Sequence, residues 1–295
     1  MFTDNLGEAG RQVPKPVDRI GYFDRLQIHL VEITNPEVDF LREQCAHFEI
    51  DKGMWPASPF EYRVQLVQPS PLAIDCLDRR DPDQTLINAA EVAVDYSYDT
   101  DEEAEEVTRI VKRGLIRRWH PHHHKVKSLW RKRKAEEIED EYIPDDEEIG
   151  VERVDGPGWA RIKSVIYREG HQRLTGQCHA VHVEIRLRSA QACKGAKVVL
   201  GKLGQFDFVG IHKRRLAVYD IDVERLGRLL RNRWNGTKSR DPLLRKLHLV
   251  EVSQDWRLGS IMLARYSNLQ EAVDGLGGLR KLGACLVPVE VGWWG

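Results

Sequence analysis

Carboxylates and a tyrosine occur in three separate segments whose residues alternate between polar and apolar, which is typical of half-buried β-strands. The segments are Asn88–Asp95, Ile162–Tyr167 and His182–Arg188. Since alternate side chains of a strand share a face, Glu91 and Asp95 lie together, and Glu184 lies opposite the apolar residues of its segment. If these strands are aligned in one sheet, three carboxylates can reach one divalent cation near the hydroxyl of Tyr167. The pattern therefore indicates phosphodiester chemistry.

The residue types favour a hard cation. Mg²⁺ and Mn²⁺ prefer oxygen ligands and keep open positions for phosphate. A tyrosine hydroxyl is a poor nucleophile at neutral pH, so a metal that polarises the phosphate complements it. We therefore predict Mg or Mn at Glu91, Asp95 and Glu184, with Tyr167 as the catalytic residue. In the alternative interpretation these carboxylates simply face water, and Tyr167 packs with its hydroxyl at the surface.

The order of the three segments resembles that of the motifs in plasmid rolling-circle replication initiators and their filamentous-phage relatives. The matching runs are Ala89-Ala-Glu-Val-Ala-Val-Asp95, Val165-Ile-Tyr-Arg168 and His182-Val-Glu-Ile-Arg-Leu-Arg188, and the likeness covers about residues 61–193. Departures are Glu91 for the usual aspartate, Ala89 and His182 where arginine is usual, and Arg168-Glu169 in place of Asn-Lys.

This resemblance implies a protein that nicks DNA and transfers the strand. Tyr167 would attack a DNA phosphate, leaving a 5′-phosphotyrosyl link and a free 3′-hydroxyl. Glu91, Asp95 and Glu184 would hold the metal. The implied partners are DNA, as a single strand or as an origin duplex, and a host helicase or polymerase. The residues expected to contact DNA within the motif strands are Lys163, His182 and Arg186.

A basic run gives a second candidate DNA contact. Residues 112–134 hold ten Lys or Arg and four His, whereas residues 135–148 hold nine acids and no base. The run could follow a DNA backbone electrostatically, or form a charged helix that pairs with the acidic stretch. For the histidines from His120 to His124, a solvated loop, phosphate contact and a metal site all stay open. The basic residues expected to bind DNA are Lys125, Lys127, Arg131, Lys132, Arg133 and Lys134.

The expected elements give an α+β fold. Strands are expected over 23–31, 61–67, 86–98, 160–168, 178–188, 214–220, 247–252 and 285–291, and helices over 101–118, 189–203, 223–234 and 269–282, with another starting at Asn35-Pro36. This order predicts a mainly antiparallel sheet with helices packed largely on one face, like a relaxase or replication initiator. The predicted organisation is a disordered arm (1–20), a nicking domain (21–234) with a charged excursion (120–150, helical from 128 to 141), and an α/β extension of that domain (235–295).

Composition is typical of a globular protein. The 295 residues are 41% hydrophobic and 31% charged, with a net charge of −1, so whole-chain charge argues neither for nor against nucleic acid. Five scattered cysteines suit a reducing compartment. Residues 1–18 lack a signal-peptide core, and no apolar run is long enough for a membrane span, so we expect a cytoplasmic protein with no membrane partner. The alternatives to a nickase are a non-catalytic DNA-binding protein of plasmid or phage origin and a structural or partner-binding protein.

Overall fold

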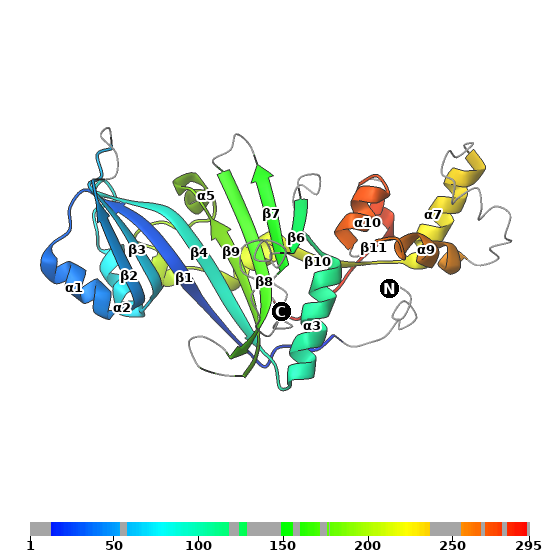
Figure 1. Cartoon of the computed structure of the whole chain (residues 1–295), viewed down its shortest axis with the longest axis horizontal. Helices are drawn as coiled ribbons and strands as arrows, with labels where there is room; N and C mark the ends of the chain where they lie inside the picture. Colours follow the sequence, from blue (N-terminus) through cyan, green and yellow to red (C-terminus); the bar gives the residue numbers. More distant parts are fainter. Residues whose placement is uncertain are drawn as a thin grey trace, which may run out of the picture. The chain divides into compact units, whose positions relative to one another are not determined.

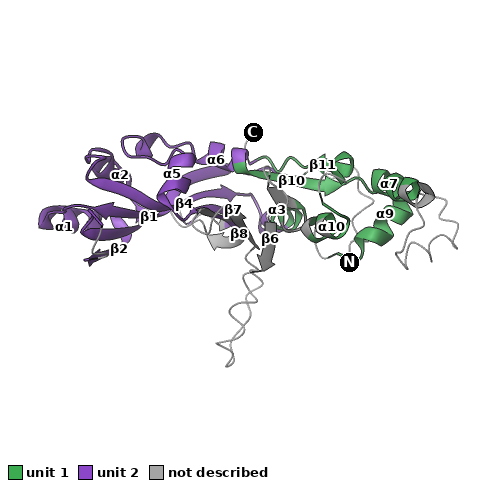
Figure 2. Cartoon of the chain, turned by 90° about the horizontal axis from the view of Figure 1, so that it is seen from above, with its two compact units in different colours: residues 1–14, 106–122, 215–292 green, residues 15–105, 123–214, 293–295 purple. Residues whose placement is uncertain are grey.

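The computed structural model describes residues 13–53, 58–117, 124–128, 149–155, 160–171, 176, 178–236, 255–266, 269–278 and 282–293. The chain divides into two compact units (Figure 2). The sheet unit comprises residues 15–105, 123–214 and 293–295, and the helical unit comprises residues 1–14, 106–122 and 215–292.

The sheet unit is built on an antiparallel sheet (Figure 1). Among the described residues its strand order is β2-β3-β1-β4-β9-β8-β7-β6, and every neighbouring pair is antiparallel. The strands are β1 (Asp18–Leu30), β2 (Cys45–Lys52), β3 (Tyr62–Pro69), β4 (Thr85–Ser97), β6 (His124–Ser128), β7 (Ile149–Asp155), β8 (Ala160–His171) and β9 (Cys178–Leu187). The motif strands β4 and β9 are direct neighbours, and β8 pairs with the other edge of β9.

Helices cover the apolar face of this sheet, which is the face that carries Leu26, Val92 and Ile185. They are α1 (Asn35–Glu43), α2 (Pro71–Asp78), α5 (Ala190–Gly195) and α6 (Phe208–Arg215). One core cluster joins all four helices to the strands through the buried residues Leu41, Leu77, Cys193 and Ile211. The predicted α+β class, with an antiparallel sheet and helices on one face, is confirmed. We call the opposite face, which carries Glu91, Asp95 and Glu184, the polar face.

Local chemistry explains where these helices begin. The Ser70 hydroxyl accepts a hydrogen bond from the Ala73 amide (3.2 Å), and the Ser189 hydroxyl accepts one from the Ala192 amide (3.1 Å). Both are the side-chain caps that an exposed first turn needs. The α1 helix begins at Asn35, directly after Thr34. The α5 helix is shorter than predicted, because the chain soon enters the left-handed region at Lys197 (φ +67°).

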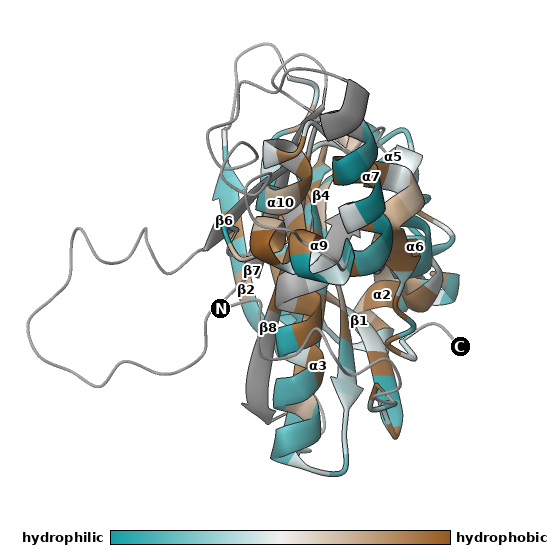
Figure 3. Ribbon diagram, turned by 90° about the vertical axis from the view of Figure 1, so that its right-hand side faces the viewer, coloured by the Kyte–Doolittle hydropathy of each residue, from teal (hydrophilic) through white to brown (hydrophobic). Residues whose placement is uncertain are grey.

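The helical unit contains β5 (Leu115–Arg117), β10 (Leu216–Ile221), α7 (Val223–Gly236), α9 (Asp255–Leu263), α10 (Leu269–Gly275) and β11 (Leu286–Pro288). Asp222 caps α7, since its Oδ1 accepts a hydrogen bond from the Arg225 amide (2.9 Å). A core of Leu226, Leu258, Leu263 and Ala272 ties α7, α9 and α10 together. The α3 helix (Asp101–Gly114) begins in the sheet unit, and its hydrophobic and hydrophilic sides are visible in Figure 3.

Several expectations differ from the structure. The β1 strand starts at Asp18, inside the segment expected to be an arm. The β2 strand and helices α2, α6 and α9 were not anticipated. His124–Ser128 is a strand that pairs with β7, within the segment that we expected to be a charged excursion. Residues 129–148 and the predicted strand 247–252 lie outside the described residues. In the described part of the chain, every helix is too short or too polar to cross a membrane.

Candidate functional site

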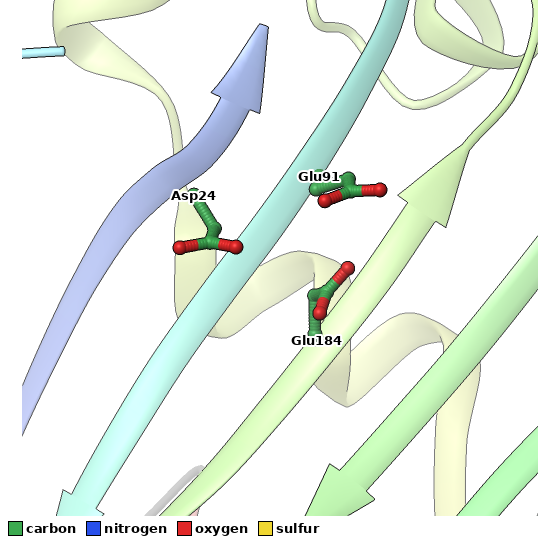
Figure 4. Close-up of side chains that lie close together, drawn as sticks. All are labelled: Asp24, Glu91 and Glu184. Atoms are coloured by element: carbon green, nitrogen blue, oxygen red, sulfur yellow. The ribbon is translucent and has the colours of Figure 1, made fainter. Parts of the chain in front are cut away.

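Three carboxylates meet on the polar face, where three adjacent strands run side by side. Asp24 belongs to β1, Glu91 to β4 and Glu184 to β9 (Figure 4). One carboxylate oxygen from each residue lies within 4.8 Å of the others. Asp24 and Glu184 are buried, whereas the side chain of Glu91 retains 14% exposure. We call these residues the acidic cluster.

A β-bulge brings Asp24 into this cluster. In a regular strand, Asp24 would share a face with Leu26, which is the apolar face. The pairing of β1 with β4 instead steps from Phe23 opposite Val92 to Arg25 opposite Glu91, so Asp24 is an extra residue in β1. A bulge of this kind turns a side chain away from its regular direction and is common beside active sites.

Two arginines contact the acidic cluster. The Arg186 guanidinium donates two hydrogen bonds to the Glu184 carboxylate, the one from Nη2 at 3.1 Å, and its Nε lies 3.5 Å from Glu91 Oε1. On the other side, Arg25 Nε lies 3.6 Å from Glu91 Oε2. These positive charges offset the repulsion between the carboxylates, which otherwise opposes their close approach.

The environments of the two glutamates drive their pKa values in opposite directions. Burial raises the pKa of Glu91, and the negative charge of Glu184 adds to this, against the opposing charges of Arg186 and Arg25. Burial also acts to raise the pKa of Glu184, but hydrogen bonds from His182 and Arg186 outweigh it and lower that pKa. Glu184 is therefore the firmly ionised member of the pair, and Glu91 is the member that takes up a proton more readily.

Asp95 lies outside the acidic cluster, in a buried network next to it. Its Oδ1 is 2.6 Å from Nδ1 of His182, and its Oδ2 accepts a hydrogen bond from the Tyr22 hydroxyl (3.1 Å). His182 Nε2 is in turn 3.7 Å from Glu184 Oε2. Asp95 and His182 are fully buried. The predicted metal set is thus divided: Glu91 and Glu184 meet, Asp95 binds His182, and Asp24 completes the cluster.

The backbone register fixes the position of Tyr167 relative to this network. On β8, Tyr167 is directly opposite His182 of β9, and Asp95 of β4 is opposite the same histidine. Lys163 pairs in the same way with Arg186. The three motif segments are consecutive strands of one sheet, and the positions of the predicted nucleophile and carboxylates fall within a few residues of one another.

The basic run is only partly described. Lys125 and Lys127 belong to β6, at the edge of the sheet in the described part of the chain. The remaining predicted DNA contacts, Arg131, Lys132, Arg133 and Lys134, lie outside the described residues. Histidines 120, 122 and 123 lie outside them as well, whereas His124 begins β6.

Comparisons with known proteins give one remote structural likeness. No protein family matches the chain, and no curated protein matches it in sequence. Among solved structures, the chain is similar to a rolling circle replication initiator protein from Geobacillus stearothermophilus, with 13% sequence identity and a TM-score of 0.38. That match covers 83% of this chain and 97% of the other.

Proposed function

We propose that this protein is a rolling-circle-type replication initiator, which nicks one DNA strand and transfers it in a metal-dependent reaction. The observation that carries the proposal is the acidic cluster of Asp24, Glu91 and Glu184. Glu184 belongs to the strand next to β8, which carries Tyr167, and Glu91 belongs to the strand after that. The resemblance of the three strand motifs to those of such initiators supports the same assignment.

The donor set of the acidic cluster fits a hard divalent cation. Asp24, Glu91 and Glu184 offer only oxygen ligands, and their separation of at most 4.8 Å suits convergence on one ion. A bound Mg²⁺ or Mn²⁺ would polarise the scissile phosphate and offset its negative charge. Hydrogen bonds from His182 and Arg186 hold Glu184 ionised, and Glu91 is partly exposed to solvent.

The proposed chemical step exchanges one phosphodiester for another. The Tyr167 oxygen bonds to phosphorus and loses its proton to solvent, while the bond from phosphorus to the 3′ oxygen breaks and that oxygen takes up a proton. The products are a 5′-phosphotyrosyl link and a free 3′-hydroxyl from which a polymerase can extend. Because the link conserves the phosphodiester, the reverse reaction can rejoin a strand.

A covalent adduct tests this proposal directly. The full chain is incubated with Mn²⁺ and a pool of single-stranded oligonucleotides, denatured, and analysed by mass spectrometry. We expect an adduct on Tyr167 that is absent with chelator and in Tyr167→Phe, but present in the matched control Tyr62→Phe. If the folded protein forms no adduct with a diverse pool, or forms one on another residue, the nickase proposal is wrong.

One observation favours the non-catalytic DNA-binding alternative. Arg186 and Arg25 already neutralise part of the acidic cluster, as an ion-pair network without a metal would. In that case the protein binds DNA with strong salt dependence, yet neither Mn²⁺ nor Tyr167 matters. DNA binding that is unchanged in Tyr167→Phe, together with no adduct in the parent protein, would select this alternative.

A further inference from the structure

We infer that a pocket beside the acidic cluster holds one nucleotide of a single DNA strand, with its phosphate near Arg25 and Arg188 and its base edge against the amides of Gln27 and Asn88. This inference rests on the proposed function and deepens it, because it names the part of the substrate that the polar face holds. Asn88 and Arg188 are end residues of two of the motif segments, but none of the four residues was predicted to belong to a site.

The pocket lies on the polar face and has a volume of about 270 Å³. Most of its lining residues are polar, and the others are Ala89, Ala90 and Leu187. Its size is near the lower end of small-molecule sites, about 300 Å³, so it suits a single nucleotide unit better than a larger ligand. The polar lining consists of Arg25, Gln27, Gln65, Asn88, Glu91 and Arg188.

A second β-bulge places Asn88 at this pocket. The pairing of β1 with β4 steps from Gln27 opposite Ala89 to Ile28 opposite Ile87, so Asn88 is an extra residue in β4. By simple alternation Asn88 has the parity of Val92 on the apolar face. The two bulges between the same two strands thus supply one polar residue to the acidic cluster and one to the pocket.

The charges of the pocket favour a phosphate. Arg25 and Arg188 supply two guanidinium groups, which match phosphate oxygens in geometry and charge. The side chain of Arg25 is 44% exposed, and its Nε lies 3.6 Å from Glu91 Oε2. Arg188 is exposed, and within the described part of the chain its side chain makes no ion pair. Glu91 is the one carboxylate in the lining, so positive charge prevails there.

The amides of the pocket favour a base. An amide group carries both a donor and an acceptor, and asparagine and glutamine use this pair to read base edges. Among the described residues, the side chains of Gln27 and Asn88 have no hydrogen-bond partner, so both amides are available. Gln65 is more constrained, because its amide nitrogen donates to Glu49 Oε2 (3.2 Å).

The position of the pocket favours a strand over a free nucleotide. Glu91 belongs both to the pocket and to the acidic cluster, so a ligand in the pocket is adjacent to a phosphate held at the cluster. A DNA strand that occupies both the pocket and the acidic cluster binds more tightly, because its contacts at the two places are linked. A mononucleotide makes contacts at only one of them. Single-stranded DNA also exposes its base edges, which a paired duplex hides.

The test measures binding of the full chain to a short labelled oligonucleotide of mixed sequence, by fluorescence anisotropy at several salt concentrations, with chelator present. Arg188→Gln should weaken binding roughly tenfold and reduce the slope of log affinity against log salt by about 0.7, the value of one lost phosphate contact on a single strand. The matched control Arg42→Gln, on α1 and away from the polar face, should change neither.

The amide variants test base recognition separately. Gln27→Ala and Asn88→Ala should each weaken binding of the normal strand roughly fivefold, without changing the salt slope. For an abasic strand of the same length, both variants should have the same affinity as the parent protein. Because Asn88 occupies a bulge, the thermal midpoint of Asn88→Ala is measured to check that this variant folds. If Asn88→Ala does not fold, the test depends on Gln27→Ala, because Gln27 is in a regular strand position.

Two results would overturn the inference: equal effects of Arg188→Gln and Arg42→Gln, or amide variants that weaken the abasic and the normal strand alike. Chelator keeps the measurement independent of strand cleavage. Failure to form a Tyr167 adduct therefore counts against the proposed chemistry alone, and adduct formation with unaltered binding in these variants counts against the pocket alone.

Discussion

Asp95 and His182 are directly opposite each other on β4 and β9, and their side chains meet at 2.6 Å with no exposure to solvent. Tyr22 binds the second oxygen of Asp95, and Glu184 lies on the other side of the histidine ring. A buried carboxylate is costly unless it is fully hydrogen-bonded. The network satisfies this requirement and, because it ends at Glu184, it also supports one member of the acidic cluster.

Asp95→Asn should therefore be strongly destabilising. The substitution keeps the size of the side chain but removes its charge, and it removes the closer of the two carboxylates beside His182. We expect the free energy of unfolding to fall by about 3 kcal/mol. Tyr22→Phe, which deletes only a hydroxyl at the same carboxylate, should cost about 1 kcal/mol. Denaturant unfolding of the two variants measures the difference, and equal costs would mean that Asp95 and His182 do not form an ionic pair.

Asp24→Asn should weaken metal binding. If Asp24, Glu91 and Glu184 share one ion, the loss of one charged ligand should lower Mn²⁺ affinity at least about tenfold. Isothermal titration calorimetry measures this affinity without any need for catalytic activity. Asp51→Asn is the matched control, because Asp51 is an exposed carboxylate on β2 that forms an ion pair with Arg63. Equal Mn²⁺ affinity in the two variants would exclude Asp24 as a ligand.

Sequence alternation predicted two members of the acidic cluster and could not predict the third. Glu91 and Glu184 follow the regular two-residue period, so their common face could be inferred once their strands were adjacent. Asp24 could not be inferred, because a bulge is an interruption of that period and depends on how β1 pairs with β4. The same reasoning explains why Asn88 was assigned to no site.

The short helices α2 and α6 were not predicted, for a different reason. The α2 and α6 helices have eight residues each, which is little more than two turns. Amphipathic periodicity needs a window of about 11 to 18 residues to stand out. The α3 and α7 helices, with 14 residues each and acidic first turns, were predicted close to their observed bounds. Short helices that tertiary packing stabilises leave little trace in the local sequence.

Arg186→Gln should separate a metal site from a purely structural ion-pair network. Without metal, the carboxylates of Glu91 and Glu184 lose a neutralising charge, so the thermal midpoint should fall. With Mn²⁺ present, the more negative cluster should bind the ion more tightly, and the Mn²⁺-induced rise in the midpoint should exceed that of the parent protein. Differential scanning calorimetry with and without Mn²⁺ measures both changes.

The control for this experiment is Arg63→Gln, which breaks the exposed ion pair with Asp51 on the same sheet. Its Mn²⁺-induced shift should equal that of the parent. If Mn²⁺ fails to stabilise either the parent protein or Arg186→Gln, the carboxylates do not bind the ion, and the acidic cluster is a structural network.

His212 makes the stability of the sheet unit sensitive to acid. Burial lowers its pKa to about 3; the backbone of Val92 opposes this shift, the charge of His182 adds to it and that of Glu184 opposes it. The ring is therefore neutral in the folded protein, whereas in the unfolded chain it titrates near 6.5. Below that pH the unfolded state binds a proton that the folded state does not, so stability falls as pH falls, over the window from about 6.5 to 3.

His212→Leu should flatten this dependence. The parent protein should lose about 1 kcal/mol of unfolding free energy per pH unit through this one residue, and the variant should lose less by that amount. Urea unfolding at several pH values between 7 and about 4 measures the slope. His47→Gln, at an exposed site on β2, is the control and should retain the parent slope. An unchanged slope in His212→Leu would show that His212 takes up its proton without unfolding, which its complete burial argues against.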